Sequence, residues 1–143
     1  MIAYPKRWTF RSYCSEKGDE IRGWYENQTP SVQAELTAVV LYLQRLGVNG
    51  WIESRWDYKE LKGRLLSLSE LRIVVGETGK KEHYRVLGFR DDSLREFTML
   101  IADRKTAKFD FYARHGPTAL RRKSDVESNR AKFSCVAKWM SLP

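Results

Sequence analysis

Long apolar runs are absent from this chain. The longest uninterrupted one covers residues 38–43, whereas a membrane-spanning helix needs about 20 predominantly apolar residues. The first residues carry positive charge, but no apolar stretch follows them, so we expect no secretory leader. These features predict a soluble, cytoplasmic protein.

Cysteine and histidine are also scarce. The chain has Cys14 and Cys135 near its two ends, no CxxC spacing, and only His83 and His115 as further soft metal ligands. This pattern favours reduced, buried thiols over a disulfide or a metal site. The P-loop, HExxH and GxSxG motifs of other enzyme classes are missing too. We therefore expect neither a metal nor an organic cofactor.

Basic charge, by contrast, is plentiful and concentrated. The chain has 26 lysines and arginines against 18 acidic residues, for a formal net charge of +8. Residues 104–123 hold seven basic residues and one acidic residue, Asp110. An acidic protein or an anionic membrane surface could also attract such charge. Because it lies next to strand-like segments, we favour a polyanion, and RNA in particular, as the partner.

The first half of the chain has mainly helical periodicity. Residues 8–13 alternate between apolar and polar, which predicts a short strand, and residues 16–28 have helical spacing. Thr29 and Pro30 suit the cap and first position of a second helix, whose apolar stripe reaches Leu46 before Gly47. Residues 48–66 lack a clean period, so we expect an irregular connection with one turn of helix.

The second half begins with strands. Period-two patterns over residues 68–75, 83–89 and 96–104, with short loops between them, predict an antiparallel meander. Ser124 and Glu127 have the spacing of a capping box, so a last helix is expected from there to about Met140. The fold class is α+β, in one domain over residues 1–143: a small antiparallel sheet of three to five strands, flanked by two N-terminal helices and one C-terminal helix.

Four segments in this order carry a resemblance to a known family. They are KELKGRLLSLSELRI (59–73), HYRVLGF (83–89), FTMLIADRKT (97–106) and DVESNRAKF (125–133). Together they resemble the RelE/ParE toxin superfamily, and within it the phage-derived, HigB-like branch. The resemblance covers most of the chain after Thr29. Residues 107–123 depart from it, because the family has a much shorter basic linker there, so they are interpreted as a basic insertion.

The resemblance implies a function and a site. RelE-like and HigB-like members are toxins of type II toxin-antitoxin systems that cleave mRNA on the ribosome without a metal. Their partners are mRNA, the ribosome and a cognate antitoxin, which we expect to be a helix-turn-helix protein. The matching positions, together with the acid-base candidates of the insertion, give a catalytic set of Arg72, Arg85, Arg104, Lys105, Tyr112 and His115. The RNA-contacting set is Lys62, Lys108, Arg114, Arg121, Arg122 and Lys123.

Other interpretations remain open at the level of sequence. A ParE-like toxin would bind a protein target such as DNA gyrase and would need no catalytic acid or base. A relative that has kept the fold and lost the activity would bind nucleic acid without cutting it. The strand arginines could also be structural, on a solvated face or paired with Glu70, Glu77 or Glu82.

Overall fold

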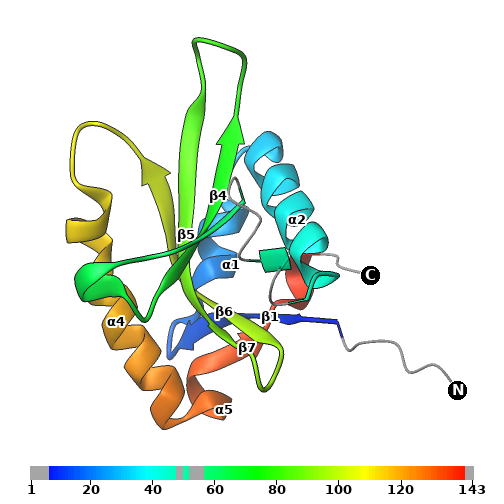
Figure 1. Cartoon of the computed structure of the whole chain (residues 1–143), viewed down its shortest axis with the longest axis vertical. Coiled ribbons are helices and arrows are strands. Elements are labelled where there is room, and N and C mark those ends of the chain that lie inside the picture. The colour runs from blue at the N-terminus through cyan, green and yellow to red at the C-terminus, as the bar shows by residue number, and fades with distance from the viewer. Residues whose placement is uncertain (1–6, 48–49, 52–56, 141–143) are drawn as a thin grey trace, which may run out of the picture.

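A mixed sheet of seven strands lies at the centre of the molecule, with helices on both faces (Figure 1). The structure, a computed structural model, describes residues 7–47, 50–51 and 57–140. The main path of the sheet is β2-β1-β6-β5-β4-β3, and β7 pairs with β1. The strands are β1 (Thr9–Ser15), β2 (Gly18–Asp19), β3 (Tyr58–Glu60), β4 (Ser69–Val75), β5 (Glu82–Asp91), β6 (Glu96–Lys105) and β7 (Ser134–Val136).

The predicted meander is confirmed as β4, β5 and β6, which pair antiparallel in chain order. In β4, Leu71 and Ile73 face one core while Arg72 points to the opposite face. A register shift between Leu87 and Gly88 interrupts the β5–β6 pairing. A side chain at Gly88 would collide with the carbonyl oxygen of Thr98, so the close approach at this bulge requires glycine.

The expected sheet of three to five antiparallel strands was wrong in size and in pairing. β1 runs parallel to β6, and β2, β3 and β7 extend the sheet at its edges. These three strands have only two or three residues each, too few to establish a period. The predicted irregular connection over residues 48–66 contains β3 and a 3₁₀ turn, η1 (Gly63–Leu65); residues 48–49 and 52–56 of it lie outside the described part.

One face of the sheet is covered by α1 (Glu20–Glu26) and α2 (Pro30–Gln44). The Thr29 hydroxyl caps α2 and Pro30 occupies its first turn, as predicted. The first helix begins four residues later than expected, because Gly18 has a φ of 105° in the turn that forms β2. Asp19 then accepts hydrogen bonds from the backbone N–H groups of Ile21 and Arg22 and caps α1.

The opposite face is covered by α4 (Phe111–Ser128), the longest described helix. The predicted basic linker is thus a helix: Asp110 caps it, and Ser124 lies near its end rather than at its beginning. The predicted helix to Met140 was wrong, because Asn129 ends α4 and the chain continues as α5 (Arg130–Phe133), β7 and η2 (Lys138–Met140). The Ser124–Glu127 spacing occurs inside a helix here, where it caps nothing.

The two cysteines form a disulfide, so the prediction of reduced thiols was wrong. Cys14 of β1 and Cys135 of β7 are joined with a Cα–Cα distance of 6.2 Å. Antiparallel pairing of these strands, in which Ser12 lies opposite Cys135, brings the two residues together across 121 positions of sequence. In the part of the chain that the structure describes, no helix is long and apolar enough to cross a membrane.

Candidate functional site

A buried carboxylate, Glu70, organises the α4 face of the sheet. Its side chain is fully buried. The Tyr112 hydroxyl donates a hydrogen bond of 2.7 Å to Oε2, and Arg72 Nε donates one of 3.1 Å to Oε1. Arg85 Nε lies 3.8 Å from the same Oε1. We call these four residues, Glu70, Arg72, Arg85 and Tyr112, the Glu70 cluster.

Strand register and a helix cap bring the cluster together. Glu70 and Arg72 are two residues apart on β4 and therefore share a face. Arg72 lies directly opposite Arg85 on β5. Tyr112 is held above them at the beginning of α4, where the Asp110 carboxylate accepts hydrogen bonds from the N–H groups of Tyr112 and Ala113. The site is thus built on rigid elements from three parts of the chain.

The cluster carries excess positive charge. Two guanidinium groups face one carboxylate, and Lys105 Nζ lies 5.4 Å from the centre of the Tyr112 ring. Arg85 is 7% exposed, and its Nη1 donates to the Tyr84 carbonyl oxygen, so it belongs to the interior. The Arg72 side chain is 24% exposed. Within the described residues its terminal nitrogens make no hydrogen bond, so Arg72 is the guanidinium that an anion can reach.

Its surroundings keep the Tyr112 hydroxyl protonated. Burial raises the pKa of its hydroxyl to about 12, and the hydrogen bond to Glu70 acts in the same direction against the lowering effect of Arg85. At neutral pH the hydroxyl therefore keeps its proton.

A second pair of titratable groups lies one turn further along α4. His115 Nε2 is 2.8 Å from Asp103 Oδ2, and Asp103 lies opposite Arg85 in the β5–β6 register. The rings of Phe109 and Phe111 flank the imidazole, at 6.1 and 4.8 Å between ring centres. A carboxylate partner favours the tautomer with the proton on Nε2, which leaves Nδ1 to accept a proton from a ligand.

The structure brings together four of the six predicted catalytic residues, Arg72, Arg85, Lys105 and Tyr112, and places a fifth, His115, one turn further along α4 against Asp103. Arg104 is not among them. It lies opposite Tyr84, whose side chain belongs to the core under α1 and α2, and it pairs with Glu82 at 3.6 Å. Because side chains alternate along a strand, the neighbours Arg104 and Lys105 point to opposite faces.

The predicted RNA-contacting residues also separate into two groups. Lys62, Lys108, Arg114 and Arg121 are exposed. Arg122 instead donates a hydrogen bond of 2.8 Å to the Leu100 carbonyl oxygen and stacks over Tyr13. Lys123 pairs with Glu127 at 3.0 Å and lies over the Phe89 ring. Arg122 and Lys123 therefore help to fix α4 to the sheet.

Sequence reasoning missed the central residue of the site. Glu70 was considered only as a carboxylate that could neutralise a strand arginine, which it does. A signal was present in the sequence: within the strand Ser69–Val75, Glu70 is the lone acidic residue. It precedes Arg72 by two positions, so both must share a face. Asp103, which binds His115, was missed in the same way.

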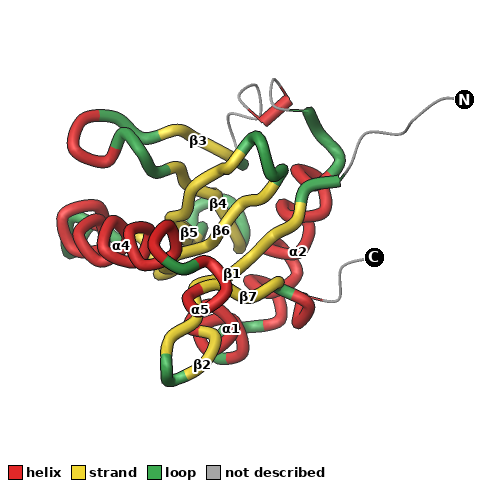
Figure 2. Tube along the Cα trace, turned by 90° about the horizontal axis from the view of Figure 1, so that it is seen from below, coloured by secondary structure: helices red, strands yellow, loops and turns green. Residues whose placement is uncertain are grey.

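A groove opens beside Tyr112. It has a volume of about 340 Å³ and is lined by Lys59, Leu61, Lys62, Leu65 and Tyr112. Three of these residues belong to the segment between β3 and β4, which Figure 2 shows folded alongside α4.

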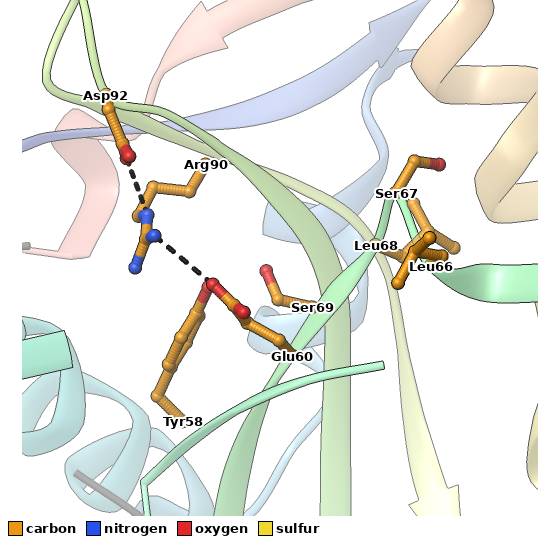
Figure 3. A pocket seen from close by; sticks show the side chains of 8 residues that line it. All are labelled: Tyr58, Glu60, Leu66, Ser67, Leu68, Ser69, Arg90 and Asp92. Atoms are coloured by element: carbon orange, nitrogen blue, oxygen red, sulfur yellow. Dashed lines mark hydrogen bonds and ion pairs between the residues drawn. The ribbon is translucent and has the colours of Figure 1, made fainter. Parts of the chain in front are cut away.

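A second hollow, of about 170 Å³, surrounds Arg90 (Figure 3). Arg90 bridges Asp92 at 2.6 Å and Glu60 at 3.2 Å. Two carboxylates for one guanidinium make this hollow unsuited to a phosphate. Among the described residues, no group of three or more His, Cys, Asp or Glu side chains could hold a metal ion.

Comparison with protein-family models, with curated proteins and with solved structures gives no match for this chain. The geometry of the α4 face and the four segments of sequence resemblance are therefore the features that indicate a function.

Proposed function

We propose that this protein is a metal-independent endoribonuclease, the toxin of a type II toxin-antitoxin pair, and that it cleaves mRNA on the ribosome. One observation carries the proposal. Arg72, Arg85 and Lys105 converge on the same face as a proton donor, Tyr112, and a proton acceptor, His115. The four segments that resemble RelE-like and HigB-like toxins support the choice of RNA and of a helix-turn-helix antitoxin as partner.

The chemistry follows from the positions of these groups. His115 Nδ1 takes the proton of a ribose 2′-hydroxyl, and the 2′-oxygen attacks the adjacent phosphorus. Arg72 and Lys105 stabilise the negative charge that develops on the phosphoryl oxygens, as a metal ion would elsewhere. The P–O5′ bond breaks and O5′ receives the Tyr112 proton as the hydroxyl turns away from Glu70, which leaves a 2′,3′-cyclic phosphate and a 5′-hydroxyl. Arg85 positions Glu70, which in turn orients the Tyr112 hydroxyl.

The test is cleavage of a defined RNA by the purified protein in the presence of EDTA, with and without translating ribosomes. We expect products with 5′-hydroxyl ends. Removing one donor to a developing oxyanion typically costs about 10²–10³ in rate, and we expect a loss of that order for Arg72→Ala.

A matched control is available in Arg22→Ala. The Arg22 side chain lies on α1 and is 57% exposed, and its ion-pair partner, Glu26, is one helical turn away. This change removes the same charge far from the Glu70 cluster and should leave cleavage unaltered. Absence of cleavage by the unmodified protein under every condition would overturn the proposal, as would equal losses in the two variants.

A specific feature favours a second candidate, a nucleic-acid-binding protein without cleavage activity. The Tyr112 hydroxyl is already bonded to a buried carboxylate, and Arg85 is almost wholly buried. Both groups would then serve structure, while Arg72 and Lys105 hold phosphates. This candidate predicts binding that weakens steeply with salt, because phosphate contacts release counterions, and no new RNA ends.

A further inference from the structure

A row of cations crosses the α4 face of the sheet over four neighbouring strands. Lys59 on β3 lies opposite Glu70 and therefore on the same face. Arg72 follows on β4, Arg85 on β5 and Lys105 on β6. The row is diagonal, because Lys59 lies opposite Glu70 and Lys105 lies opposite His83; at about 4.8 Å between strands it extends roughly 14 Å across the sheet. Arg85 is buried, so a polyanion that enters at the sheet edge formed by β3 would meet the positive charge of Lys59, Arg72 and Lys105.

The segment of residues 61–67, which we call the flap, forms a wall beside this path. Gly63 has a φ of 65° and begins the η1 turn. The turn places Leu65 against Gly116 of α4, so closely that a Cβ at Gly116 would lie 2.9 Å from Leu65 Cδ2. The glycine in α4 therefore lets the flap rest on the helix, and Figure 2 shows the segment between β3 and β4 alongside α4.

The groove between the flap and Tyr112 has two chemical parts. Leu61, Leu65 and the Tyr112 ring give it apolar walls, and the exposed Lys59 and Lys62 supply positive charge at its rim. An occupant that fits both the apolar walls and the basic rim must have a flat, largely apolar body attached to a negatively charged group. A nucleotide of a single strand has this form, whereas a duplex hides the faces of its bases.

Building on the proposed function, we propose that this groove is a base-binding subsite for single-stranded RNA. One unstacked base lies between the flap and Tyr112, and Lys59 and Lys62 bind the phosphates on either side of it. The chain continues along the cation row, where the neighbouring phosphate reaches Arg72 and Lys105. The subsite thus selects unpaired RNA and sets which phosphate meets Tyr112 and His115.

The first experiment measures binding separately from cleavage. Fluorescence anisotropy with a 2′-O-methyl oligonucleotide, which lacks the attacking hydroxyl, gives the affinity for the single strand and for its duplex. We expect the single strand to bind more tightly. The affinity falls as salt rises, with a negative slope of log K (the association constant) against log salt. In Lys59→Ala/Lys62→Ala, two lost phosphate contacts should make this slope shallower by roughly 1.4, at about 0.7 per contact for single strands.

The control is Lys80→Ala/Lys81→Ala, which removes two exposed lysines from the turn between β4 and β5. This control should change the slope of log K against log salt less than Lys59→Ala/Lys62→Ala does. Equal slopes for the two double variants would overturn the subsite, and so would duplex binding as tight as single-strand binding.

A second experiment locates the base directly. An oligonucleotide with one 4-thiouridine is cross-linked by light, and the attached peptides are identified by mass spectrometry. Adducts on residues 59–66 and on Tyr112 would support the subsite. Adducts confined to the outer side of α4, at Arg114 and Arg121, would overturn it.

The binding and cleavage measurements test the subsite and the nuclease proposal separately. Cleavage of a 2′-hydroxyl RNA by the unmodified protein, together with unchanged binding by Lys59→Ala/Lys62→Ala, would remove the subsite and leave the nuclease proposal standing. Groove-dependent binding of the single strand without any cleavage would support the subsite and reject the nuclease.

Discussion

At the scale of single residues, Glu70 is the group on which the site depends most. It is fully buried and partners a hydroxyl and two guanidinium groups. Removing one member of a buried charged network leaves the others uncompensated, at a typical cost of about 3–5 kcal/mol. We therefore expect Glu70→Ala to lower the free energy of unfolding by about that amount in urea denaturation.

The control for this prediction is Glu82→Ala on the same sheet. Glu82 pairs with Arg104, and both side chains are at least 40% exposed, so the ion pair is well solvated. Glu82 also accepts a hydrogen bond from the Tyr84 hydroxyl. Loss of such an ion pair costs less than about 1 kcal/mol, and loss of the hydrogen bond about 1 kcal/mol more. If Glu70→Ala proved no more destabilising than Glu82→Ala, Glu70 would not be the organiser of this face.

Sequence predicted the basic residues of the site better than the acidic ones. Arg72 and Arg85 carry the resemblance to known toxins and lie on one face, as alternation along two strands requires. Glu70 and Asp103 could not be assigned in the same way, because a carboxylate gains its role from the cation or imidazole beside it. That neighbour is supplied by pairing between strands and by α4, neither of which is visible in a local pattern.

At the scale of elements, the beginning of α4 decides where Tyr112 lies. The Asp110 carboxylate accepts hydrogen bonds from the N–H groups of Tyr112 and Ala113. Replacing such a cap by alanine typically costs about 1 kcal/mol. We expect Asp110→Ala to lower the free energy of unfolding by about that amount, and also to weaken RNA binding and any cleavage, because the first turn that carries Tyr112 frays.

The matched control is Thr29→Ala at the beginning of α2, on the other face of the sheet. The Thr29 hydroxyl caps that helix, so stability should fall by a similar amount of about 1 kcal/mol. RNA binding should stay unchanged. Equal effects of the two variants on binding would mean that the α4 cap acts through overall stability alone.

Helices and strands long enough to show a repeating apolar pattern could be predicted from the sequence. Elements that are defined by the segments they pack against could not. The stripe of α2 and the alternation of β4, β5 and β6 can be recognised from the residues themselves. Most of α4 was missed, since its positive charges and Gly116–Pro117 obscure the apolar positions that face the sheet. Of these, Phe111, Ala119 and Val126 are fully buried or nearly so.

At the scale of the whole molecule, the N- and C-terminal parts of the described chain meet at β1. β1 takes β6 as a parallel neighbour on one side and β7 with β2 on the other. The contacts of β1 with β6 and β7 join residues that are far apart in sequence. No local pattern specifies such a pairing, which is why the mixed sheet was not predicted although most of its longer strands were.

The Cys14–Cys135 disulfide fixes this long-range closure. A bridge between distant residues stabilises mainly by restricting the unfolded chain, by typically 2–4 kcal/mol, and this one spans 121 positions. We expect dithiothreitol to lower the free energy of unfolding by roughly 2–4 kcal/mol. The double variant Cys14→Ser/Cys135→Ser should have this lower free energy of unfolding without reductant, and dithiothreitol should not change it.

RNA binding should respond differently from stability. The Glu70 cluster is built from β4, β5 and α4, and the disulfide joins β1 to β7, so the affinity for a single strand well below the unfolding temperature should survive reduction. A loss of affinity with the fold intact would show that the bridged strands β1 and β7 influence the site. The bridge also removes the support that free thiols gave to a cytoplasmic location, because disulfides are rare in the cytosol. If the protein acts there on ribosomes, as we propose, it must do so in the less stable, reduced form.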